Sequence, residues 1–69
     1  MPDSKTIGER IKNLRKKNYM TQAQLADTIG IQQSAIAMYE NGERVPRDEI
    51  KILLAKALGR SVNFIFFAD

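Results

Sequence analysis

The side chains that could do chemistry in this chain are amides, hydroxyls, carboxylates and cations, because its 69 residues include no Cys and no His. Without these two residue types the chain lacks the usual zinc ligands, the thiol nucleophile and the commonest general base. The eight carboxylates are scattered over positions where helix caps or ion pairs would use them. We therefore expect no metal, no cofactor and no enzymatic activity.

The cations are distributed unevenly along the chain. Residues 1–20 carry six basic and two acidic groups, and residues 41–60 carry five basic and three acidic groups, whereas residues 21–40 contain no Lys or Arg. This asymmetry suits a protein that binds phosphates at its edges and contacts bases with neutral side chains. A charged face that merely solvates a small domain is the alternative interpretation.

Helix signals follow one another closely and predict five short helices, no strand and a single all-α domain over residues 1–69, with its core in about 6–67. Thr6–Glu9 and Thr21–Gln24 each fit a capping box at a helix start. Gly30 and Gly59 can end a helix in the left-handed conformation, and Ser61 can cap the last turn. The predicted helices are Thr6 to about Asn18, Gln22 to Ile29, about Gln33 to Glu40, a fourth after Pro46 that ends before Gly59, and Val62 to about Phe67.

Apolar residues recur at helical spacing and predict which helix faces form the core. In the first, fourth and fifth helices these residues are Ile7, Ile11, Leu14, Ile50, Leu53, Leu54, Ala57, Leu58, Val62, Ile65 and Phe66.

The segment from Gln22 to Tyr39 has the spacing of a helix-turn-helix. Ala26 is a small residue where a second helix would cross the first, and Gly30 tolerates the positive φ that the tight turn needs. The core-facing positions of this unit are apolar: Leu25, Ile29, Ile31, Ile36 and Tyr39. Each of these seven residues alone is a weak sign of a helix-turn-helix, but all seven fall in register between two capped helices.

From Ile7 to Phe66 the chain resembles the lambda-repressor-like, Cro and Xre type of helix-turn-helix domain. The stretches that carry the resemblance are Ile11–Arg15, Met20–Ala26, Tyr39–Gly42 with Pro46 beyond, Ala55–Gly59 and Ser61–Val62. The resemblance implies a five-helix bundle that binds operator DNA, usually as a dimer.

The resemblance also implies roles for individual residues. Arg15 and Glu40 occupy positions that form a partly buried ion pair in many members, which is a structural role. Base contacts are expected from Gln33, Ser34, Ala37 and Met38. Backbone contacts are expected from Thr21, Gln22, Gln32, Asn41, Arg44 and Arg47. Gln32 departs from the family pattern, which commonly has Ser or Thr at this position. Gln is a poor N-cap.

Helical spacing supports the base contacts independently. If Ala35, Ile36 and Tyr39 face the core, then Gln33, Ser34, Ala37, Met38 and Asn41 point outward. Gln can bond bidentately to adenine N6 and N7, and an outward Met suits contact with thymine methyls. A polar helix face with an incidental Met is the alternative. We interpret the basic run Arg15–Lys17 as a solvated complement to the helix dipole rather than a DNA site.

Phe64 and Phe67 lie off the face predicted for Val62, Ile65 and Phe66. Two further phenylalanines are hard to bury in so short a chain, so they suggest a partner surface and a homodimer interface. In the alternative, Phe67 folds back and caps the core.

Two functions remain open at this point. The first is a sequence-specific regulator of transcription, of phage or bacterial repressor type, that binds a palindromic operator as a dimer. The second is an antitoxin or antirepressor whose main partner is a protein bound through the aromatic C-terminal surface, with secondary DNA binding. The chain has no apolar run long enough for a membrane span and no secretory signal, so we expect a cytoplasmic protein.

Overall fold

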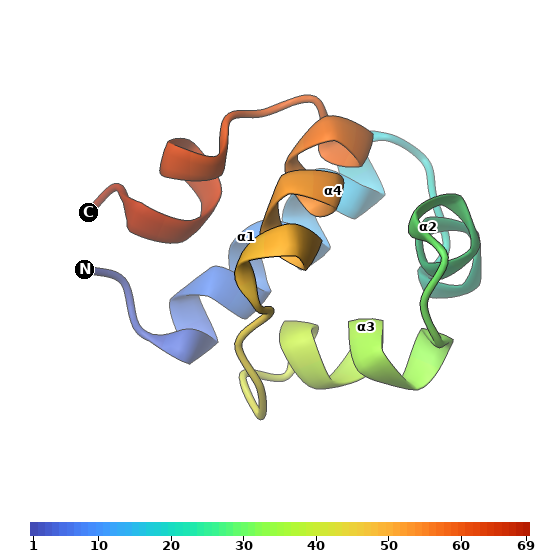
Figure 1. Ribbon diagram of the computed structural model, residues 1–69, viewed down its shortest axis with the longest axis horizontal. Helices are drawn as coiled ribbons and strands as arrows, with labels where there is room; N and C mark the ends of the chain where they lie inside the picture. The colour runs from blue at the N-terminus through green and yellow to red at the C-terminus, as the bar shows by residue number, and fades with distance from the viewer.

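Five helices and no strand make up the computed structural model, which describes all residues 1–69 (Figure 1). Helix α3 lies at one edge of the molecule, α1 and α4 pass through its middle, and the two chain ends lie close together (Figure 1). The helices are α1 (Ser4–Lys17), α2 (Gln22–Ile29), α3 (Gln33–Glu40), α4 (Asp48–Leu58) and the short η1 (Asn63–Phe67). The predicted fold class is confirmed.

The N-cap of helix α1 lies three residues earlier than predicted. Asp3 is the N-cap, and its carboxylate accepts a hydrogen bond of 2.8 Å from the backbone N–H of Thr6. The capping box predicted at Thr6–Glu9 is therefore wrong, because Thr6 already lies inside the first turn. The bond from Thr6 lowers the pKa of the Asp3 carboxyl, so this cap stabilises α1 at neutral pH and is lost as the pH falls through that lowered pKa.

Helix α2 begins and ends as its local signals predict. The Thr21 hydroxyl accepts from the backbone N–H of Gln24, and the Gln24 side chain accepts from the N–H of Thr21. Gly30 ends the helix at φ 76°, in the left-handed region that favours glycine. This turn sets the angle at which α3 leaves α2.

The hydrophobic core contains most of the predicted residues. The buried apolar side chains are Ile7, Ile11, Leu14, Leu25, Ala26, Ile36, Tyr39, Ile50, Leu54, Ala55, Leu58, Ile65 and Phe66. Ile29, Ile31, Ala57 and Val62 pack partly buried against them. Leu53 is a correction: it is 39% exposed, because α4 turns Ile50, Leu54 and Leu58 toward the core and Leu53 lies beside that face.

Helices α1 and α3 cross at Gly8, in very close contact. A Cβ atom at this position would lie 2.4 Å from the carbonyl oxygen of Tyr39 and 2.6 Å from that of Glu40. Backbone at such distances cannot give way cheaply, so only glycine lets α1 approach the end of α3 this closely. The contact fixes α3 relative to the rest of the bundle.

The C-terminal helix is a single wide π-type turn held against α1. The backbone N–H of Ala68 donates to the carbonyl of Asn63 at 2.7 Å, a bond between residues five apart, and the predicted Ser61 cap accepts from the N–H of Phe64. Arg10 of α1 donates from Nη1 to the carbonyl oxygens of Phe64 and Ala68. This one guanidinium therefore ties the two ends of the chain together. None of the helices is long and apolar enough to cross a membrane.

Candidate nucleic-acid interface

The outward face of α3 carries the side chains predicted to contact bases. Gln33, Ser34 and Met38 are exposed, and Ala37 is half-buried between them and the core. Ile36 and Tyr39 on the opposite face are buried. The predicted division of α3 into an inner and an outer face is confirmed, and the outer face offers an amide, a hydroxyl and a thioether with no charge.

A buried ion pair holds the end of α3 against α1. Arg15 donates from Nε to Glu40 Oε2 at 2.6 Å and from Nη2 to Oε1 at 3.0 Å, with side chains only 10% and 2% exposed. The hydrogen bonds to Glu40 raise the pKa of Arg15 above its ordinary value, so the guanidinium stays charged. Arg15 also donates to the carbonyl of Met20, which ties the turn before α2 into the same network. The contact between Arg15 and Glu40 expected from the resemblance is present in the structure.

Gln22 belongs to this network as well, which the sequence does not reveal. Its Nε2 donates to Glu40 Oε1 at 3.1 Å, so the first residue of α2 is fixed to the last residue of α3. The side chain is half-buried. One amide hydrogen is therefore engaged inside the protein, and the other remains for the phosphate contact that we expect of Gln22.

The start of α3 lacks a side-chain cap. Gln32 makes no capping hydrogen bond, as expected of a residue that is a poor N-cap. The backbone N–H groups of Gln33 and Ser34 have no partner within the chain. Because unpaired N–H groups and the helix dipole both favour an anion, this end of α3 suits a phosphate.

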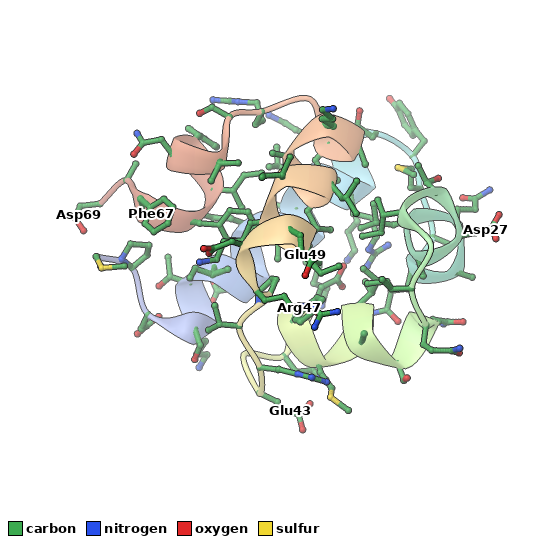
Figure 2. The ribbon with its side chains drawn as sticks, in the orientation of Figure 1. Asp27, Glu43, Arg47, Glu49, Phe67 and Asp69 are labelled. Carbon is green, nitrogen blue, oxygen red and sulfur yellow. The ribbon has the colours of Figure 1, made fainter.

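The loop after α3 carries two cations, Arg44 and Arg47. Arg44 is exposed and makes no ion pair, and Arg47 meets only the exposed Glu49, with 3.4 Å between Nε and Oε1 (Figure 2). Asn41 is exposed and its amide donates to Glu43. Arg44 thus has no ion-pair partner within the chain, and the contacts of Arg47 and Asn41 both lie at the surface.

Phe64 and Phe67 are each 39% exposed, so neither is buried in the core. Each ring is covered by a different cation: the Arg60 guanidinium lies 3.6 Å from the centre of the Phe64 ring, and Lys51 Nζ lies 4.9 Å from that of Phe67. Phe67 lies at the end of the chain beside α4 (Figure 2). The two rings are thus partly exposed but contact different neighbours.

Comparison with known proteins agrees with this geometry. A family model described as helix-turn-helix matches residues 11–65. The transcriptional repressor RstR of the cryptic phage CTXphi of Vibrio cholerae is 44% identical over 57 residues, which are 83% of this chain and 51% of the relative. Repressor protein C2 of Salmonella phage P22 is 34% identical over 97% of this chain and 31% of the relative.

Among solved structures, the P22 c2 repressor in complex with a synthetic operator superposes with a TM-score of 0.87 at 36% identity, over 91% of this chain and 96% of that one. The family is one of DNA-binding domains, in agreement with the expectation that the chain is not an enzyme. The chain belongs to the helix-turn-helix family and is a lambda-repressor-like DNA-binding domain.

Proposed function

We propose that this chain binds a specific duplex operator through the outer face of α3 and regulates transcription as a repressor of phage or bacterial type. The observation that carries the proposal is the placement of Gln33, Ser34 and Met38 on the free face of a helix whose other face is fixed by the Arg15–Glu40 pair. The similar proteins of CTXphi and P22 are named as repressors, and the P22 structure contains an operator. Such a regulator would act in the cytoplasm.

The contacts divide by chemistry into two groups. Gln33 can bond adenine bidentately, and Met38 can pack on a thymine methyl, so these side chains would distinguish base pairs. Thr21, Gln22, Gln32, Asn41, Arg44 and Arg47 would contact the backbone, because they flank α3 with hydrogen-bond donors and cations. Specificity then comes from α3, and most of the affinity comes from its edges.

Selection of bound duplexes from a random pool tests the proposed function. We expect one enriched motif, which contains A·T pairs under Gln33 and Met38 and repeats with twofold symmetry. Failure to enrich any motif, at salt concentrations where the protein still binds duplex, would contradict sequence-specific regulation.

Replacing Arg44 or Arg47 with Ala should weaken binding to all duplexes alike. Each substitution removes about one phosphate contact, so the slope of log K against log salt concentration should flatten by about one per protomer. Fluorescence anisotropy over a range of salt concentrations measures this slope. A change in which sequence is preferred would instead place these arginines among the base contacts.

We also propose that the chain pairs through its C-terminal aromatic residues. One short helix makes few base contacts, and a second copy doubles them, with half-sites about 34 Å apart. Phe64 and Phe67 are partly exposed on η1 and could supply the apolar area. Because they contact different cations, the two rings are tested separately.

Sedimentation should show that Phe67→Ser and Phe64→Ser each reduce pairing on operator DNA, and that the double variant abolishes it. Thermal unfolding checks that each variant still folds. Wild type that binds palindromic DNA as a single copy, or a double variant that pairs as well as wild type, would exclude this interface.

A further inference from the structure

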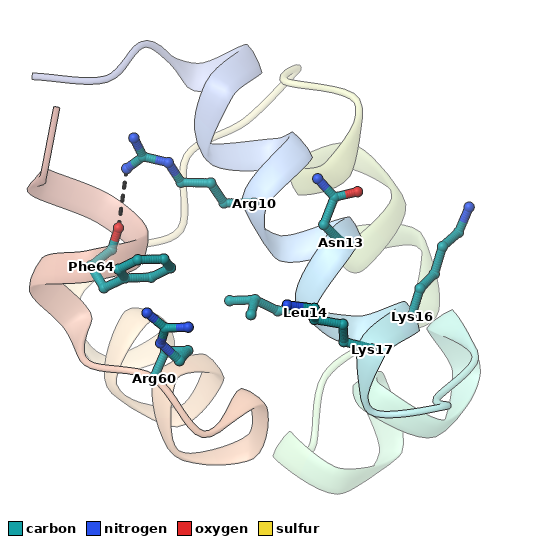
Figure 3. Close-up of a pocket in the computed structure, with 7 residues that line it drawn as sticks. All are labelled: Arg10, Asn13, Leu14, Lys16, Lys17, Arg60 and Phe64. Atoms are coloured by element: carbon teal, nitrogen blue, oxygen red, sulfur yellow. Dashed lines mark hydrogen bonds between the residues drawn. The ribbon is translucent and has the colours of Figure 1, made fainter.

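A basic groove lies between α1 and the C-terminal segment. It encloses about 650 Å³, and one side of it is the Phe64 and Arg60 pair while the other is α1 (Figure 3). The residues that line it are Arg10, Asn13, Leu14, Lys16, Lys17, Arg60 and Phe64. None of them belongs to α2, α3 or the loop after α3, so the proposed operator contacts do not use this groove.

The charge of the groove is not neutralised within the protein. Four of its seven lining residues are cations and none is a carboxylate. Lys16, Lys17 and Arg60 form none of the ion pairs of this structure, and the Asn13 amide has no hydrogen bond within the chain. Cations gathered in a concave site raise the local concentration of anions there.

Two of the arginines are held in place before anything binds. Arg10 is fixed by bonds from Nη1 to the carbonyls of Phe64, at 3.1 Å, and Ala68, at 2.7 Å, which leaves Nη2 and Nε without a partner (Figure 3). The Arg60 guanidinium carbon lies 3.6 Å from the centre of the Phe64 ring, and its side-chain N–H groups form no hydrogen bond or ion pair within the chain. A planar guanidinium with free N–H groups bonds a carboxylate bidentately.

The shape and the aromatic wall indicate the class of occupant. A nucleotide base would stack on Phe64, but the Arg60 guanidinium already lies against that ring. A duplex is too broad to enter a groove of about 650 Å³, so it would meet only the cations at its rim. An extended peptide with carboxylates on successive outward positions can place several of them inside a groove of this volume.

We propose that the groove between α1 and η1 is a docking site for an acidic peptide segment of a partner protein. Arg10, Lys17 and Arg60 bind its carboxylates, and Leu14 with the edge of Phe64 contacts its apolar atoms. Because the site is separate from α3, it stays open while one copy of the chain is on DNA, whereas the pairing proposed through Phe64 would compete with the peptide. The inference does not depend on which operator α3 selects.

Fluorescence anisotropy with a labelled peptide of alternating Glu and Ala tests the proposal. The wild-type chain should bind it, and the matched peptide of Gln and Ala should bind about tenfold more weakly or worse. The double variant Lys16→Glu with Lys17→Glu should also bind the Glu and Ala peptide about tenfold more weakly, or worse. Lys5→Glu with Lys12→Glu is the matched control, because it makes the same change in net charge at exposed positions of α1 outside the groove.

The lysine reversals place negative charge at the C-terminal end of α1 and could destabilise it, so a milder pair of variants accompanies them. Arg60 lies just after α4 and lines the groove, so Arg60→Gln should lower the affinity for the peptide severalfold. Lys56→Gln removes the same charge from α4 outside the groove and should leave that affinity unchanged. If the groove variants and the control variants lose the same affinity for the peptide, the binding depends only on the net charge of the chain, and the proposal is overturned.

Two competitors distinguish the other anions. Inorganic phosphate at matched ionic strength should not displace the peptide. A duplex with a single half-site, on which the chain does not pair, should form a ternary complex with chain and peptide. Displacement by phosphate alone would make the groove a site for small anions, and displacement by duplex would make it part of the DNA-binding surface. Either result contradicts a peptide site.

Discussion

Replacing Glu40 with Ala should lower the free energy of unfolding by about 3–5 kcal/mol, because Arg15 would be left charged and buried without its partner. The two side chains share two hydrogen bonds and are almost completely buried. A domain of this size has a small core, so a loss of that magnitude removes much of its stability. Urea unfolding followed by circular dichroism measures the change.

Glu49→Ala is the matched control, since Glu49 pairs with Arg47 in full solvent and should cost less than about 1 kcal/mol. A double variant, Arg15→Met with Glu40→Leu, removes both charges together and should recover a large part of the loss. If Glu40→Ala costs no more than Glu49→Ala, the buried pair does not hold α3 in place.

Gln33→Ala with Met38→Ala should abolish discrimination between the selected operator and its single-base variants. Gln33→Ala alone should cost about 1–3 kcal/mol on the best duplex, because a bidentate contact to one base is lost. Anisotropy against a panel of duplexes, each changed at one base pair, gives the preference at every position. The effect should be confined to the base pairs under α3.

Asn63→Ala is the control, because it removes an exposed amide from η1 rather than from α3. It should change neither affinity nor preference. An unchanged preference in the Gln33 and Met38 double variant would remove α3 from the role of recognition helix.

The boundaries of α2 follow from the sequence because local chemistry defines them. Thr21 and Gln24 satisfy each other's backbone at one end, and Gly30 accepts the positive φ at the other. The start of α1 is harder to predict, because Asp3 and Thr6 both lie before plausible first turns. In the structure Asp3 is the N-cap, and Thr6 lies within the first turn of α1.

The outer face of α3 could also be predicted, because helical spacing fixes which residues point away from Ile36 and Tyr39. What fixes α3 in space could be predicted only in part. The bond from Gln22 to Glu40 joins residues 18 apart, and the need for glycine at Gly8 arises only where two backbones cross. Leu53 was misplaced because periodicity gives a face but not its width.

The groove between α1 and η1 had no signal of its own in the sequence. Arg10 and Lys17 lie seven residues apart on α1, but Arg60 is far from both along the chain, and the run Arg15–Lys17 suits a solvated helix end. Only the packing of the C-terminal turn onto α1 brings Arg60 to the cations of α1. Arg10 makes that contact through backbone carbonyls, which no residue pattern specifies.

Affinity cleavage from α3 tests most directly whether this helix lies in the major groove of the operator. Because the chain has no Cys, Ser34→Cys creates a single thiol on the outer face of α3, to which an iron–EDTA group can be attached. We predict strand cleavage inside each half-site of the selected operator, and little cleavage from Lys56→Cys on α4. Cleavage from position 56 with none from position 34 would contradict the account.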